Sequence, residues 1–226
     1  ICQAGYLLAL LGREVPTPVE QAPRAWSRGM LRAFVNDKNF LKVILVQSLC
    51  IVLFLPTFNL FLAQYGLREV GMPDAASATM AIVMQCSRIA MAGVVGIFID
   101  RFSPKRILPF LPILGAVTLL PAIVWKSAMG VYLATGLSAV YFVGHYGAFQ
   151  ALQYGLPTPE NRAGHYTLAI LIGTGMTALG NLAVGNLCDR LSYRPAFITL
   201  GLLAVAVAGL AHWILKDLSH NPKDYA

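Results

Sequence analysis

The sequence has 226 residues, of which 57% are hydrophobic and 12% charged, and its formal net charge is +7. The charged share is about half of the roughly 25% typical of soluble globular chains. This composition excludes an ordinary soluble domain and indicates a membrane protein.

Residues 1–11 are apolar but can cover only ~16 Å as a helix, about half of a bilayer. They lack an initiator Met and a basic region, so they do not fit a signal peptide. We expect them to be the end of a preceding transmembrane helix, which makes the chain a fragment of a longer protein.

Residues 12–39 form the only long polar segment, and they begin with a proline-rich stretch that is typical of a linker. Two sets of side chains then recur every four residues on different faces of a short predicted helix: Arg24, Arg28 and Arg32, and Trp26, Met30 and Phe34. Two readings stay open: a helix lying on the inner leaflet, bases toward headgroups and aromatics toward acyl chains, or a solvated linker helix.

Six apolar stretches follow, each long enough to cross a hydrocarbon core of ~30 Å as a helix. They span residues 40–63, 75–98, 107–125, 129–154, 162–187 and 196–215. The alternation of barrel strands is missing. The predicted fold class is therefore an all-α membrane protein, with a six-helix domain over 40–215 and a tail over 216–226.

The basic residues are distributed unequally between the two sides of these spans. Twelve lie on the side of both termini (Arg13, Arg24, Arg28, Arg32, Lys38, Lys42, Arg101, Lys105, Arg106, Arg162, Lys216, Lys223) and four on the other (Arg68, Lys126, Arg190, Arg194). Because short basic loops stay in the cytoplasm, both termini are predicted to be cytoplasmic. This distribution also argues against nucleic acid as a partner.

The third and sixth spans are almost free of polar side chains, and we expect them to face lipid. The other four carry polar stripes, which predicts a buried hydrogen-bonded seam or a wet cavity between them. Arg88 lies near the middle of the second span, on one face with Gln85, and none of the ten acids lies at its depth. The predicted solute contacts are Arg88, Gln85, Tyr141, His145 and Asn59, and an anionic solute is preferred.

No catalytic, metal-binding or cofactor-binding constellation is evident, so neither an enzyme nor a bound metal or cofactor is predicted. The four cysteines are expected to be buried apolar residues without disulfides. The glycines of GTGMTALG, residues 173–180, lie inside a span, which favours close helix packing over a nucleotide loop.

The stretch GIFIDRFSPKR, residues 96–106, resembles the loop signature GxxxDRxGxKR of the major facilitator superfamily. Gly96, Asp100, Arg101, Lys105 and Arg106 match, whereas Ser103 replaces the usual glycine. The stretch GNLCDRLSYRPAF, residues 185–197, is similar to a second pattern, GxxxDRxGYRxxF, that joins the last two helices in many members.

The resemblance implies the C-terminal half of a twelve-helix secondary transporter in the cell (inner) membrane. Its partners would be the lipid bilayer, the N-terminal six-helix half of the same protein and a small-molecule substrate. The signature residues would form a cytoplasmic gate, with Asp100 near Arg162 at the start of the fifth span and Arg101 bonded to neighbouring helix ends. Transport would proceed by alternating access, and a non-transporting membrane sensor or assembly module is the alternative.

Overall fold

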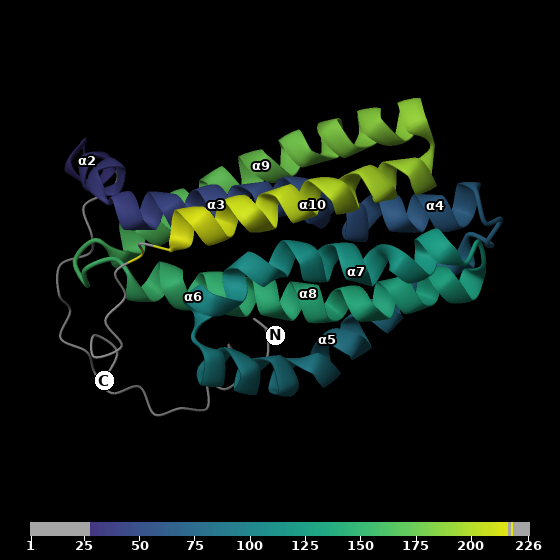
Figure 1. The fold of residues 1–226 in the computed structure, drawn as a ribbon, viewed down its shortest axis with the longest axis horizontal. Coiled ribbons are helices and arrows are strands. Elements are labelled where there is room, and N and C mark those ends of the chain that lie inside the picture. The colour runs from purple at the N-terminus through teal and green to yellow at the C-terminus, as the bar shows by residue number, and fades with distance from the viewer. Residues whose placement is uncertain (1–27, 217, 219–226) are drawn as a thin grey trace.

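The computed structural model describes residues 28–216 and Leu218, and it is built from helices (Figure 1). In chain order these are α2 (Arg28–Asn36), α3 (Lys38–Pro56), η1 (Thr57–Phe61), α4 (Leu62–Arg68), α5 (Ala75–Phe102), α6 (Pro104–Ile107), η2 (Leu108–Phe110), α7 (Leu111–Val124), α8 (Ala128–Gly155), α9 (Arg162–Leu191) and α10 (Tyr193–Leu215). Residues 1–27, 217 and 219–226 lie outside the described residues. The predictions for the preceding helix, most of the linker and most of the tail fall there.

Six helical segments are long and apolar enough to cross a membrane: Lys38–Arg68, Ala75–Phe102, Pro104–Val124, Ala128–Gly155, Arg162–Leu191 and Tyr193–Leu215. Each starts within about three residues of the predicted span. The predicted all-α, six-span fold is therefore confirmed, and the protein is a multi-pass membrane protein.

The helices α3 and α8 form the centre of the bundle. The helix α5 packs against α8, and α9 packs mainly against α3. These two flanking helices run along opposite edges of the bundle in Figure 1, with α5 at the bottom and α9 at the top. The apolar helices α7 and α10 pack against each other, with α7 on α8 and α10 on α3.

The helix α3 continues toward Arg68 through a proline and a π-helical turn. Pro56 lies inside the helix and has no N–H to donate to the carbonyl of Val52. A Cβ atom at Gly180 of α9 would lie 2.8 Å from that carbonyl oxygen and 2.9 Å from Cγ of Pro56. Close packing through the glycine motif, predicted from the sequence, is thus confirmed at Gly180.

Both stretches that resemble the superfamily patterns contain a serine with positive φ. Ser103 ends α5 at φ 65°, ψ 135°, and Ser192 ends α9 at φ 67°, ψ 168°. Each replaces the glycine of its pattern, and this part of φ/ψ space is strained for any residue with a Cβ. The serines therefore keep the turn that the pattern's glycine would make, at a cost in backbone strain.

The short helix α2 docks on the first turn of α9, at the left end of Figure 1. A Cβ atom at Gly164 would clash with the sulfur of Met30. The ring of Phe34 lies 5.4 Å from that of His165, and both side chains are buried. Met30 and Phe34 therefore pack on α9. Of the two readings left open for this segment, the one that turned these side chains toward acyl chains does not hold, because α9 offers them an apolar surface.

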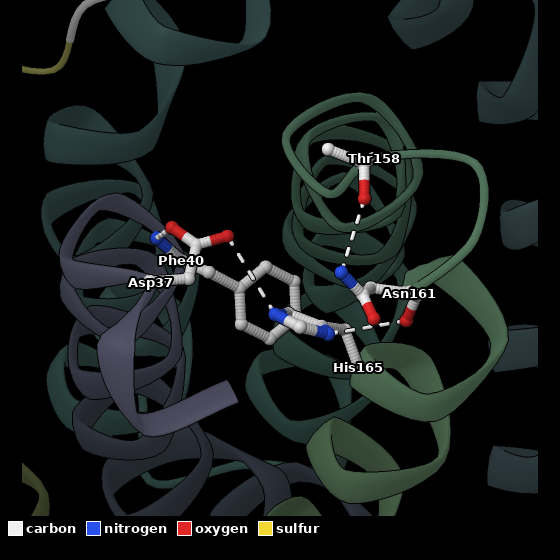
Figure 2. A network of polar contacts seen from close by, with 5 residues as sticks. All are labelled: Asp37, Phe40, Thr158, Asn161 and His165. Carbon is white, nitrogen blue, oxygen red and sulfur yellow. Dashed lines mark hydrogen bonds and ion pairs between the residues drawn. The ribbon is translucent and has the colours of Figure 1, made fainter. Parts of the chain in front are cut away.

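A polar network joins the start of α3 to the start of α9 beside this docking site (Figure 2). Asp37 caps α3, with its Oδ1 accepting a hydrogen bond of 3.0 Å from the backbone N–H of Phe40. Its Oδ2 lies 3.6 Å from Nε2 of His165, while Nδ1 of the same ring donates to the carbonyl of Asn161 at 3.1 Å. A single carboxylate thus both starts α3 and ties it to α9.

The strained serines yield the first prediction. Ser192→Gly should raise the free energy of unfolding by about 1 kcal/mol, because strain of ~1–3 kcal/mol is relieved while the unfolded chain gains some entropy. Denaturant unfolding of the purified full-length protein in micelles measures the change. Ser192→Ala keeps the strain and is the matched control; a glycine variant no more stable than the alanine variant would contradict this account.

The cap of α3 yields the second prediction. Asp37→Ala should lower the free energy of unfolding by about 1 kcal/mol, since it removes the N-cap acceptor and the partner of His165. Asp37→Asn keeps a capping oxygen and should lose only a few tenths of a kcal/mol. Equal losses for the two variants in the same unfolding experiment would show that the cap contributes nothing.

Candidate functional site

Two cavities lie along one face of the α3–α8 pair, at different depths. The first, here called the Arg88 cavity, has a volume of about 240 Å³ and lies toward the end of the bundle opposite α2. It is lined by Phe58, Asn59, Ala63, Ser77, Met80, Ala81, Met84, Gln85, Arg88 and Thr135. Three of the predicted contact residues, Arg88, Gln85 and Asn59, are brought together here.

Arg88 reaches from α5 onto the aromatic centre of α8. Its Cζ atom lies 3.9 Å from the centroid of the Phe142 ring, which is a close cation–π contact. Its Nε is buried without a hydrogen-bond partner, and among the described residues no carboxylate forms an ion pair with it. The guanidinium is therefore held in place by an aromatic ring, and no acid of residues 28–216 neutralises its charge.

Phe142 belongs to a cluster of rings between α3 and α8. Its ring lies 5.9 Å from Phe58, 5.8 Å from Tyr141 and 6.3 Å from Tyr146, with which it is stacked. Because Phe142 and Phe58 are almost fully buried, the ring under Arg88 has little freedom to move. The packing of α8 against η1 thus fixes the position of the positive charge.

The second cavity, here called the glutamine cavity, has a volume of about 260 Å³ and lies between α3, α8 and α9, toward the α2 end. It is lined by Gln47, Ile51, Leu55, Tyr146, Phe149, Gln150, Gln153, Tyr166, Ala169, Ile170, Gly173, Thr174 and Thr177. Neither α7 nor α10 contributes to either cavity, in agreement with the peripheral place expected for the third and sixth spans.

Tyr141 and His145, the other two predicted contacts, lie in neither cavity. Both are buried in the seam between α8 and α3, where the Tyr141 hydroxyl donates to the carbonyl of Cys50 at 3.2 Å. Nδ1 of His145 lies 3.5 Å from the same hydroxyl. The polar stripe of α8 with Ser138, Tyr141 and His145 therefore belongs to the seam. The side of α8 that lines the cavities lies next to this stripe.

The residues of the GIFIDRFSPKR stretch lie at the α5–α6 junction. Asp100 and Arg101 are exposed, Gly96 is half-buried, and Lys105 donates a hydrogen bond to the carbonyl of Leu218. Asp100 forms no ion pair with Arg162, although both residues are among those described. The predicted contact of Asp100 with the start of α9 is thus not formed in this structure, in which α5 and α9 flank opposite edges of the bundle (Figure 1).

Sequence reasoning missed several residues of this face, above all Phe142, Gln153 and Tyr166. Tyr146, Gln150 and Gln153 are spaced by four and three residues, which places them on one side of a helix. That spacing could have predicted the polar lining of the glutamine cavity. The sequence offered no signal for Phe142, because an aromatic residue in a membrane span is normally interpreted as a packing residue.

The fold is shared with a solved transporter structure. The chain resembles a bacterial homologue of the human lysosomal transporter Spinster, solved in an inward-facing and unoccupied conformation, with a TM-score of 0.61 and 16% identity. The match covers 97% of this chain and 58% of the other, so the chain spans little more than half of that protein's length. No family model matches the sequence. No curated protein matches it either.

This likeness shows the fold. The chain is arranged as six of that transporter's helices are, which confirms the half-bundle expected from the resemblance of residues 96–106 and 185–197.

The position of Tyr141 yields the third prediction. Tyr141→Phe should lower the free energy of unfolding by about 1 kcal/mol, because it removes one buried hydrogen bond between α8 and α3. Solute affinity should stay unchanged, since the hydroxyl points into the seam. Loss of affinity without loss of stability in parallel unfolding and uptake measurements would return Tyr141 to the set of solute contacts.

Proposed function

We propose that the chain is one half of a secondary transporter of the major facilitator superfamily, which moves a small anionic solute by alternating access. The observation that supports this proposal is the position of Arg88 in the wall of a cavity within the membrane-spanning bundle, without a neutralising acid in the described part of the chain. The shared fold and the two loop patterns support the superfamily.

The energetics favour an anion as the ligand of Arg88. A guanidinium at mid-bilayer costs at least ~2.5 kcal/mol unless it is hydrated or paired. The stacking on Phe142 returns only ~0.5–2 kcal/mol. A carboxylate or phosphate that enters the cavity would supply the missing charge through the donors of the guanidinium fork.

The neighbours of Arg88 suit such a ligand. Asn59 and Gln85 line the same cavity and are exposed, so their amides can donate to the remaining oxygens of an anion. Phe58 and the methionines Met80 and Met84 supply apolar walls. A small solute with one anionic group fits this lining better than a cation does, because no acid is among the lining residues.

The remaining parts of the proposal follow the superfamily. The α2 end would be cytoplasmic, the chain would lie in the cell membrane, and a second six-helix half would complete the cavities. Asp100 and Arg101 are exposed at the α5–α6 junction and would meet that second half as a gate. Rocking of the two halves would then expose the Arg88 cavity to each side in turn.

Uptake by the full-length protein in proteoliposomes tests the role of Arg88. Arg88→Gln should raise the KM for a transported carboxylate or phosphate about tenfold to a hundredfold, as expected for a lost charge-assisted hydrogen bond. Arg88→Lys keeps the charge but loses the planar fork of donors, so its KM should lie between those of the wild type and Arg88→Gln. Unchanged KM and selectivity in Arg88→Gln would rule out Arg88 as the anion site.

A further inference from the structure

The glutamine cavity differs from the Arg88 cavity in its chemistry. None of its thirteen described lining residues is charged, whereas three glutamines and two threonines are among them. Its apolar side is made by residues such as Ile51, Leu55 and Phe149. A cavity of this kind has no charge to neutralise an ion, but it can satisfy uncharged hydrogen-bonding groups.

Some polar groups of this cavity already form hydrogen bonds within the protein. The remaining donors and acceptors are those that a ligand could use. Nε2 of Gln153 donates to Oε1 of Gln47 at 2.5 Å, so Gln47 keeps its N–H donors and Gln153 its carbonyl oxygen. Thr174 and Thr177 each donate to a backbone carbonyl at 2.9 Å, and their oxygens remain as acceptors. Gln150 makes no hydrogen bond within the described part of the chain. Donors and acceptors are thus both available.

The size and place of the cavity also fit a solute rather than a structural gap. Its volume of about 260 Å³ is far more than one ordered water needs. Along α8, Gln150 lies eight residues beyond Phe142, or ~12 Å at 1.5 Å per residue. The ring pair of Phe142 and Tyr146 lies between the two cavities, since the first carries Arg88 and the second lines the glutamine cavity.

From this arrangement we infer that the glutamine cavity is a second binding station, for uncharged groups that both donate and accept hydrogen bonds, such as the hydroxyls of a polyol. Together with the proposed function, on which this part of the inference rests, it defines the solute as an anion that also carries hydroxyl groups. The charged group is held at Arg88, and the hydroxylated part is held nearer the α2 end as the solute passes along α8.

Saturation-transfer NMR on the full-length protein in micelles tests this inference with three probes: glucose, gluconate and hexanoate. Glucose has hydroxyls without charge, hexanoate has charge without hydroxyls, and gluconate has both. Gln150→Leu and Thr174→Val should each weaken binding of glucose and gluconate about threefold to tenfold, one lost hydrogen bond each, and leave hexanoate unchanged.

The chain offers a matched control for Thr174→Val. Thr199 of α10 is half-buried and donates to its i−4 carbonyl at the same 2.9 Å as Thr174, but it lines neither cavity. Thr199→Val should leave all three probes unchanged. Arg88→Gln should weaken the binding of gluconate and hexanoate and leave the binding of glucose unchanged.

Three outcomes would overturn the second station: no binding of glucose or gluconate, equal affinities for gluconate and hexanoate, or binding of both hydroxylated probes that survives Gln150→Leu and Thr174→Val. Failure of the proposed function looks different. If Arg88→Gln leaves the binding of gluconate and hexanoate unchanged, the proposed anion site is wrong. The glucose titrations would still test whether the glutamine cavity is a binding station.

Discussion

An arginine side chain within a lipid bilayer must be hydrated, paired with an acid or bound to a ligand, because an uncompensated charge at that depth is too costly to keep. Arg88 meets this constraint through its surroundings: it lies on the ring of Phe142 and lines a cavity between η1, α4, α5 and α8. The cavity exists because the polar faces of these helices turn toward one another. The location of the charge and the arrangement of the helices therefore depend on the same requirement.

In the α3–α8 pair, one side of α8 holds the bundle together, and another side lines the cavities. On one side of α8, Ser138, Tyr141 and His145 are buried against α3 and bind backbone carbonyls or each other. On an adjacent side, Thr135, Tyr146 and Gln150 line the two cavities. Behind the pair, α7 and α10 complete the packing with apolar side chains. This division lets one side of α8 stabilise the fold while another side lines the two cavities.

The sequence predicted the spans and the most informative charge because these depend on properties that one residue or one stretch carries by itself. Hydrophobic length fixes a membrane-spanning helix, and Arg88 in an apolar span has to avoid lipid wherever its neighbours lie. The close approach at Gly180 followed from the same kind of local property, since small residues let helix backbones meet.

What the sequence left open or predicted incorrectly depends on which residues become neighbours in space. The polar stripe of Tyr141 and His145 could face a cavity or another helix, and periodicity cannot distinguish the two. Neither of the two readings left open for this segment placed Met30 and Phe34 on α9, because that surface lies more than 120 residues away in sequence. The positive φ of Ser103 was hidden for a different reason: a serine gives no local signal for a conformation that glycine normally adopts.

The central claim is that residue 88 faces water inside the bundle. A nitroxide spin label placed at this position in the full-length protein, in liposomes, reports its surroundings through power-saturation EPR with a water-soluble nickel complex and with oxygen. The account predicts greater accessibility to the nickel complex at position 88 than at Leu202, an exposed position on the apolar helix α10. Oxygen accessibility at position 88 as high as at Leu202, with no access for nickel, would place the side chain in lipid and contradict the account.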